Sequence, residues 1–123
     1  MMSTAKKTLV LGASPNTERY SNRAASELMH YKHPVELLGI KDGEINGQEI
    51  DKSPKMYDDI DTVTMYLGAR HQTEYYQYLF ALEPNRVVFN PGAENDELCQ
   101  RLEKKGIECI EACTLVMLSI GNY

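Results

Sequence analysis

The chain has 123 residues, which is enough for one domain with a single hydrophobic core. Its 18 acidic and 13 basic residues give a net charge of −5, which argues against nucleic-acid binding because that usually needs a basic face. The longest apolar run, Leu115–Leu118, is far too short to span a bilayer. We therefore expect residues 1–123 to form one domain whose partner is a small molecule, with no nucleic acid and no membrane.

The N-terminus and the cysteines predict a cytoplasmic location. Residues 1–7 contain no apolar segment typical of a signal peptide. The three cysteines are odd in number and form no Cys-x-x-Cys pair, so the sequence indicates neither a disulfide framework nor a zinc site. We expect a reducing compartment and buried thiols at Cys99, Cys109 and Cys113, because cysteine is among the most buried residue types.

The first half of the chain alternates between strand-like and helix-like segments. The apolar run Leu9–Leu11 ends at Gly12, and apolar residues then recur at helical spacing from Ala24 to Met29. A run of β-branched and aromatic residues precedes Gly68, as is typical of a strand. The expected elements are, in order, a strand at 9–11, a helix that begins after Tyr20 and stops at Pro34, a strand at 35–40, an extended excursion at 41–50, a short helix capped by Ser53 and Pro54, and a strand at 61–67.

The second half continues this alternation. Asn95 can cap a helix that has acids in its first turn and lysines in its last, the order that the helix dipole favours. The apolar ending, residues 113–120, does not distinguish helix from strand. The other expected elements are, in order, a helix at 75–82 before Pro84, a strand at 86–90, a helix from Asn95 to Lys105 closed by Gly106, and a strand at 107–110.

These repeated strand–helix–strand units predict an α/β fold. Short connections of this kind require right-handed crossovers, which gives a three-layer, Rossmann-like arrangement. We expect a five-stranded, mainly parallel sheet with helices on both faces. Ligands of such sheets bind beyond the carboxyl ends of the strands, where the chain order reverses. This rule selects the four loops at residues 12–21, 39–44, 68–72 and 90–94, each of which begins at or next to a glycine.

The loop after the first strand indicates a phosphate-bearing ligand. A loop that opens a helix leaves backbone N–H groups and the positive end of the helix dipole available to an anion. The dinucleotide pattern G-x-G-x-x-G is incomplete, because Ser14 stands where its second glycine would be. The second strand is followed by Lys41 rather than by an acid, which suits a phosphorylated ribose better than NAD. The ATP-hydrolysing pattern G-x-x-x-x-G-K-[S/T] is absent.

Further segments, spread in order along nearly the whole chain, match one family. They are Gly12–Pro15, Arg19–Ser21, Gly43–Gly47, Asp61–Gly68, Phe89–Gly92 and Glu111–Leu118. In these segments the chain resembles the small, stand-alone CoA-binding proteins, which are related to the CoA-binding domain of succinyl-CoA synthetase. The resemblance implies the same Rossmann-like fold and a site for coenzyme A or an acyl-CoA.

The resemblance also implies roles for matching residues. The diphosphate would be held by Gly12, Ala13, Ser14, Pro15, Asn16, Arg19, Tyr20 and Ser21, with Arg19 as the cationic partner. The adenosine would lie along Gly39, Ile40 and Lys41, with Lys41 near the ribose phosphate. The adenine or pantetheine side would be lined by Leu67, Gly68, Ala69 and Arg70, and the floor near the pantetheine arm would be closed by Asn90, Pro91 and Gly92. Many family members have Asn-Pro-Lys where this chain has Gly39-Ile40-Lys41, so the lysine is kept and the proline is lost.

Two classes of function follow, and a third option stays open. The first is a binding or regulatory module without chemistry of its own, and the second is a small acyl- or thiol-transfer enzyme that uses Ser14, His71 or Cys113. The third is a nucleotide-binding subunit of a larger complex, as a homo-oligomer or with an unknown protein partner. No nucleophile–base pair is evident in the sequence, which favours the binding module.

Other polar and aromatic residues have structural explanations. His71 fits the first turn of a helix, and the tyrosines of residues 75–78 divide between core and surface at helical spacing. The acids Glu94, Asp96 and Glu97 suit a helix start without any acid–base role. We therefore name no catalytic residue and no metal ligand.

Overall fold

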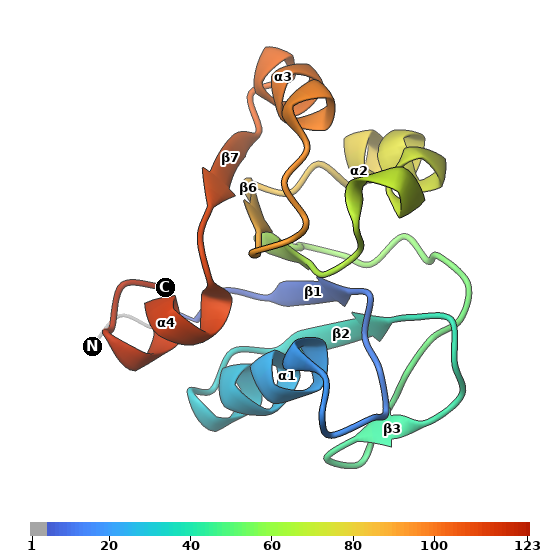
Figure 1. Ribbon diagram of the computed structural model, residues 1–123, viewed down its shortest axis with the longest axis vertical. Helices are drawn as coiled ribbons and strands as arrows, with labels where there is room; N and C mark the ends of the chain where they lie inside the picture. Colours follow the sequence, from blue (N-terminus) through green and yellow to red (C-terminus); the bar gives the residue numbers. More distant parts are fainter. Residues whose placement is uncertain (1–4) are drawn as a thin grey trace.

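A five-stranded, fully parallel sheet forms the centre of the structure, a computed structural model that describes residues 5–123 (Figure 1). Its strands are β1 (Thr8–Leu11), β2 (Val35–Leu38), β5 (Thr62–Met65), β6 (Arg86–Phe89) and β7 (Glu108–Glu111). They lie in the order β2-β1-β5-β6-β7, and every neighbouring pair is parallel. The predicted α/β, Rossmann-like fold is confirmed. Residues 1–4, on which the signal-peptide prediction partly rests, lie outside the described residues.

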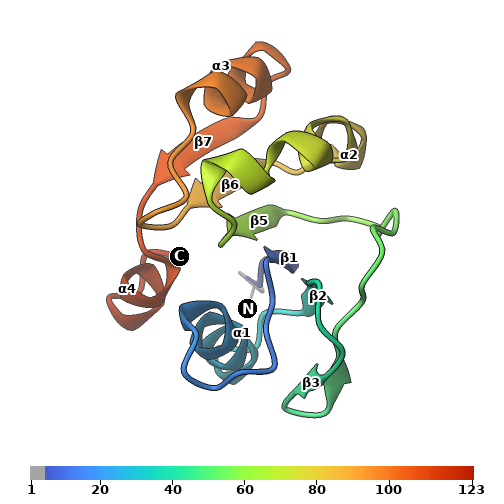
Figure 2. The same ribbon diagram turned by 45° about the vertical axis from the view of Figure 1, so that its right-hand side comes forward.

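Helices cover both faces of the sheet, as predicted (Figure 2). The helices α2 (Tyr76–Leu82) and α3 (Asp96–Lys104) pack on one face, and α1 (Tyr20–His30) and α4 (Thr114–Ser119) lie on the other. All residues of β1, β5 and β6 are buried, which explains why these strands, apart from Arg86, are apolar or β-branched along their length instead of alternating. In the part of the chain that the structure describes, no helix is long and apolar enough to cross a membrane.

The caps of α3 follow the prediction closely. The Asn95 side chain accepts a hydrogen bond from the backbone N–H of Leu98 at 3.0 Å, and acids occupy the first turn. Gly106 ends the segment with a φ of +80°, which few other residues adopt. The ending that the sequence left open is the helix α4, and two short 3-10 turns, η1 (Ala69–His71) and η2 (Thr73–Tyr75), precede α2.

The connection between β2 and β5 differs from the prediction. The expected extended excursion is present as a hairpin of β3 (Glu44–Ile45) and β4 (Gln48–Glu49), but the short helix expected at Ser53 and Pro54 is wrong. Asp51 instead pairs with the edge of β2, because its N–H donates to the Leu37 carbonyl at 2.8 Å. This backbone pairing carries the chain onward in an extended form and leaves no turn to begin a helix.

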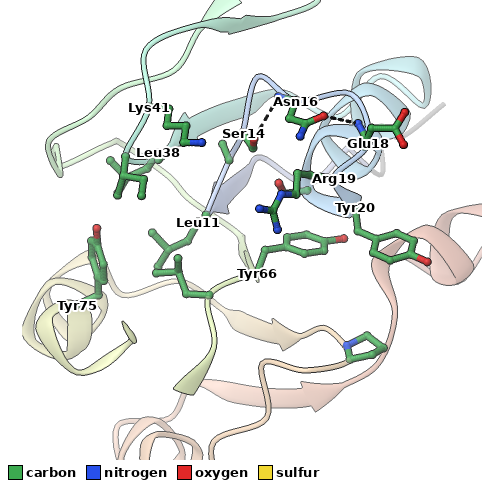
Figure 3. Close-up of a pocket in the computed structure, with 17 residues that line it drawn as sticks. Leu11, Ser14, Asn16, Glu18, Arg19, Tyr20, Leu38, Lys41, Tyr66 and Tyr75 are labelled. Atoms are coloured by element: carbon green, nitrogen blue, oxygen red, sulfur yellow. Dashed lines mark hydrogen bonds between the residues drawn. The ribbon is translucent and has the colours of Figure 1, made fainter. Parts of the chain in front are cut away.

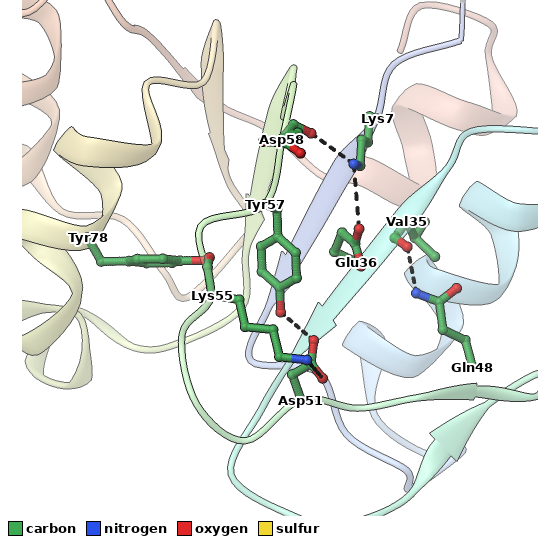
Figure 4. Close-up of polar contacts among 9 residues, drawn as sticks. All are labelled: Lys7, Val35, Glu36, Gln48, Asp51, Lys55, Tyr57, Asp58 and Tyr78. Carbon is green, nitrogen blue, oxygen red and sulfur yellow. Dashed lines mark hydrogen bonds and ion pairs between the residues drawn. The ribbon is translucent and has the colours of Figure 1, made fainter.

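Side chains hold the irregular residues 51–60 against the body of the molecule (Figure 4). The Tyr57 hydroxyl donates to the Asp51 carboxylate at 2.6 Å, and Lys55 pairs with the same carboxylate at 3.0 Å. The Tyr78 hydroxyl, from α2, donates to the Lys55 carbonyl at 2.6 Å. Asp51 pairs with β2 and Tyr78 belongs to α2, so these contacts connect β2 to α2 through residues 51–60.

Two glycines allow the loops after β1 and β2 to touch. A Cβ at Gly39 would overlap the carbonyl oxygen of Ala13, and a Cβ at Gly43 would lie 2.5 Å from the Pro15 ring. We expect Gly39→Ala to lower the free energy of unfolding by about 1–3 kcal/mol, the usual cost of forcing an extra group into a packed site.

Urea denaturation measures this effect, and Gly68→Ala is the matched control. A Cβ at Gly68 would meet no atom within 4 Å, and its φ of −66° suits any residue. We expect that variant to stay within about 0.5 kcal/mol of the parent. Equal stability of the two variants would contradict the close approach at Gly39.

Candidate functional site

A cavity of about 520 Å³ lies beyond the carboxyl ends of β1, β2 and β5 (Figure 3). The strand β2 pairs with one edge of β1, and the later strand β5 pairs with the opposite edge of β1. The order of the strands therefore reverses at β1. The volume falls within the range of small-molecule sites. The lining residues are Leu11, Gly12, Ala13, Ser14, Asn16, Glu18, Arg19, Tyr20, Ser21, Leu38, Gly39, Ile40, Lys41, Tyr66, Leu67, Tyr75 and Pro91.

Hydrogen bonds to β2 and within the loop itself hold the loop after β1 in place. The backbone N–H groups of Gly12 and Ala13 both donate to the Leu38 carbonyl, at 2.9 and 3.0 Å. The Ser14 hydroxyl oxygen accepts from the Asn16 N–H at 3.1 Å, and the Asn16 side chain accepts from the Glu18 N–H at 2.9 Å (Figure 3). Gly12 and Ala13 therefore line the cavity with N–H groups that are already used, whereas the Ser14 hydroxyl keeps its proton free to donate.

The start of α1 supplies unused donors at the cavity wall. Within residues 5–123, no group accepts a hydrogen bond from the backbone N–H of Ser14, Tyr20 or Ser21, and no side chain caps this helix. Both Tyr20 and Ser21 line the cavity, and the N-cap residue Arg19 lines it too. Free N–H groups at the positive end of a helix dipole favour an anion.

Two cations without acidic partners reach the same space. Neither Arg19 nor Lys41 takes part in an ion pair with any of the residues that the structure describes. Figure 3 shows both side chains projecting over the cavity from opposite sides of the Ser14 turn. Beside Lys41, the Ile40 side chain is 79% exposed. The polar wall thus combines unpaired positive charge with unused backbone donors.

Apolar and aromatic residues form the rest of the wall. Leu11 and Leu38 end their strands here, and Tyr75 faces them from η2 (Figure 3). Tyr66 directly follows β5, and its hydroxyl is buried and has no hydrogen-bond partner within the described chain. Burial raises the pKa of Tyr66, so this hydroxyl stays protonated.

The sequence missed five of these lining residues: Leu11, Glu18, Leu38, Tyr66 and Tyr75. Leu11, Leu38 and Tyr66 stand at or next to the carboxyl end of a strand, so the same rule that selected the loops could have included them. Tyr75 had no such signal, because its position depends on how η2 packs over the sheet.

Several predicted site residues are not among those that line the cavity. Pro91 does line it. The predicted residues that do not line it are Pro15, Gly68, Ala69, Arg70, Asn90 and Gly92. Two of the three reactive groups considered for an enzyme, His71 and Cys113, do not line it either. Pro15 instead packs on Gly43, and the Gly92 N–H donates to Glu94 at 2.9 Å.

Asn90 has a clear structural role. Its side chain is buried, donates to the Thr64 hydroxyl at 2.8 Å and to the Met65 carbonyl at 3.0 Å, and accepts from the Thr114 N–H at 2.8 Å. It therefore joins the end of β6 to β5 and to the start of α4.

The chain belongs to the CoA binding domain family, whose model matches residues 6–119. It is similar to a crystal structure described as that of an uncharacterized protein, with 44% identity and a TM-score of 0.96 over 98% of this chain and 100% of the other. A hypothetical protein from Pyrococcus horikoshii OT3 is 22% identical, with a TM-score of 0.86 over 95% of this chain and 84% of its own. A Thermus thermophilus protein is 20% identical, with a TM-score of 0.85 over 97% and 91%. The last two likenesses show the fold alone, and no curated protein gives a significant match.

Removal of the Asn90 side chain should affect folding. Asn90→Ala leaves the Thr114 N–H and the Thr64 hydroxyl without these buried partners, and we expect a loss of about 2–3 kcal/mol in the free energy of unfolding. Urea denaturation provides the measurement. Asn85→Ala is the control, because Asn85 is exposed and, within the described residues, its side chain donates only to the Asp61 carboxylate, at 2.9 Å. A loss at Asn90 no greater than at Asn85 would contradict this role.

Proposed function

We propose that the protein binds coenzyme A, or an acyl-CoA, in the cavity beyond β1, β2 and β5, as a binding or regulatory module. The observation that carries this proposal is the pair of unpaired cations, Arg19 and Lys41, at one cavity beside an uncapped helix start. Membership of the CoA binding domain family supports the choice of ligand. Coenzyme A carries a diphosphate and a separate ribose phosphate, so it needs two cationic positions rather than one.

The diphosphate is best accommodated at the start of α1. Arg19 offers a planar, permanently charged fork, and the N–H groups of Tyr20 and Ser21 lie at the same wall without acceptors. The Ser14 hydroxyl adds a neutral donor. Charge-assisted hydrogen bonds from several fixed donors suit a diphosphate.

The adenosine then lies toward the β2 side of the cavity. Lys41 supplies the cation for the ribose phosphate, while Ile40 and Tyr75 offer apolar and aromatic surface to the adenine ring. Figure 3 shows Leu38, Lys41 and Tyr75 gathered at one end and Tyr20 and Tyr66 at the other. The pantetheine arm would therefore extend toward Tyr66 and Pro91, which line the cavity at that end.

The composition of the wall supports binding rather than group transfer. The 17 lining residues include no cysteine and no histidine. Of the three reactive groups considered for an enzyme, only Ser14 reaches the cavity, and its hydroxyl oxygen accepts from the Asn16 N–H. The three free cysteines also suit the cytoplasm, which we propose as the location.

Titration calorimetry of the purified protein with CoA, dephospho-CoA and NAD tests the ligand. We expect CoA to bind most tightly, because only CoA presents a ribose phosphate to Lys41. Lys41→Ala should weaken CoA binding by about 1–3 kcal/mol and leave dephospho-CoA nearly unchanged. Lys52→Ala is the control, since Lys52 pairs with Asp42 at 2.9 Å and does not line the cavity. Tighter binding of NAD, or no binding of any of the three, would refute the proposal.

The position of the diphosphate has its own test. Arg19→Ala should weaken CoA and dephospho-CoA by similar amounts of about 1–3 kcal/mol, because both ligands carry the diphosphate. Arg23 provides a matched control one helical turn later, as it stacks on the Tyr20 ring and does not line the cavity. If Arg23→Ala weakened binding as much as Arg19→Ala, a general charge effect would explain the result instead.

Incubation with acetyl-CoA separates a binding module from a transfer enzyme. We expect the intact mass of the protein to stay unchanged and no thiol to be released beyond spontaneous hydrolysis, because neither Cys113 nor His71 lines the cavity. Mass spectrometry and a thiol reagent provide the readouts. An acetyl adduct on Ser14 or Cys113, or catalytic release of CoA, would favour the enzyme.

A further inference from the structure

Far from the cavity, three side chains with metal-binding atoms converge between α3 and β7. They are Cys99 and Glu103 of α3 and Cys109 of β7, and the two sulfur atoms and a carboxylate oxygen all lie within 4.8 Å of one another. Cys99 and Glu103 are four residues apart and so share one face of the helix. We propose that this cluster, the α3–β7 site, binds a thiophilic divalent cation such as Zn²⁺.

The ligand set and its spacing suit zinc. Thiolate and carboxylate are both zinc ligands, with bonds of about 2.3 Å to sulfur and about 2.1 Å to oxygen in a tetrahedral centre. Such bonds place the ligand atoms within about 4 Å of one another, so only small side-chain rotations are needed from the observed arrangement. Glu103 is exposed and the cysteines are half-buried, which leaves a fourth position open to water.

Acidic side chains accompany the two thiols. Glu103 belongs to the cluster, and Glu108 precedes Cys109 in β7. Glu103 has no ion-pair partner among residues 5–123. A divalent ion would displace the two thiol protons to solvent, and the two thiolates and the Glu103 carboxylate would then balance its charge.

No sequence motif indicates this site, because Cys99 and Cys109 are ten residues apart and belong to no metal-binding pattern. The three cysteines were expected to be buried, but all are only partly buried. The fold brings two of them together, since Cys109 faces α3 from β7 and its thiol donates to the Cys99 carbonyl at 3.5 Å. A bound ion would tie α3 to an edge strand that, in the described chain, pairs only with β6.

Cadmium is the probe, because thiolate-to-cadmium charge transfer absorbs in the ultraviolet and Cd²⁺ shares the ligand preference of Zn²⁺. The full chain, kept reduced with a phosphine, should show a band that saturates at one Cd²⁺ per chain. Zn²⁺ should abolish the band by competition and raise the melting temperature.

Four variants make the assignment specific. Cys99→Ser and Cys109→Ser should lose the band, whereas Cys113→Ser should keep it, because Cys113 is the one cysteine outside the cluster. Glu103→Gln should weaken Cd²⁺ by about tenfold or more, since even the hydrogen-bond partners of metal ligands contribute that much. Glu103 is exposed, so that variant keeps the test valid if a cysteine variant fails to fold.

Three results would overturn the α3–β7 site. They are no band with the parent protein, a band that persists in both Cys99→Ser and Cys109→Ser, and a band that requires Cys113. A disulfide between Cys99 and Cys109 in the air-exposed protein, together with no Cd²⁺ binding by the reduced protein, would also overturn it and indicate thiol redox chemistry instead.

Discussion

The close backbone contact between the loops after β1 and β2 is the constraint on which the site depends. The Leu38 carbonyl accepts from both Gly12 and Ala13, and the missing Cβ of Gly39 lets the Ala13 carbonyl approach. This contact fixes the first turn of the β1 loop without using the donors further along it. Within residues 5–123 the N–H groups of Tyr20 and Ser21 have no acceptor at the cavity wall, so a phosphate would not have to displace an internal partner.

The same contact explains how Lys41 is positioned without the proline found in many CoA-binding proteins. Gly39 is held on one side by Ala13 and on the other by its N–H, which donates to the Asp51 carbonyl at 2.9 Å. On the far side of Lys41, Gly43 packs on Pro15. The backbone around the lysine is thus fixed from both ends by tertiary contacts instead of by a proline ring. Asp51 takes part in this support, although no residue of 51–60 lines the cavity.

The sequence predicted those parts of the fold that local chemistry decides. The strand runs, the Asn95 cap and the turn at Gly106 are examples, and so is the rim at which the cavity lies. It failed where distant partners decide. Ser53 and Pro54 carry a helix-start pattern, yet the pairing of Asp51 with β2 holds the chain extended. Asn90 follows a strand like a ligand-binding residue, but its amide is used by groups on β5 and α4. Tyr75 and the meeting of Cys99 with Cys109 depend on helix packing, for which a single sequence has no signal.

Amide chemical-shift mapping by NMR tests the central claim most directly, because it reports where CoA binds without altering any residue. On addition of CoA to ¹⁵N-labelled protein, the account predicts the largest shifts at residues 14–21, at 39–41 and at Tyr66 and Leu67. The N–H groups of Tyr20 and Ser21 should move most, since they gain an acceptor. Shifts concentrated instead around the separate hollow formed by Lys32, His33 and Tyr123, or no shifts at millimolar CoA, would contradict it.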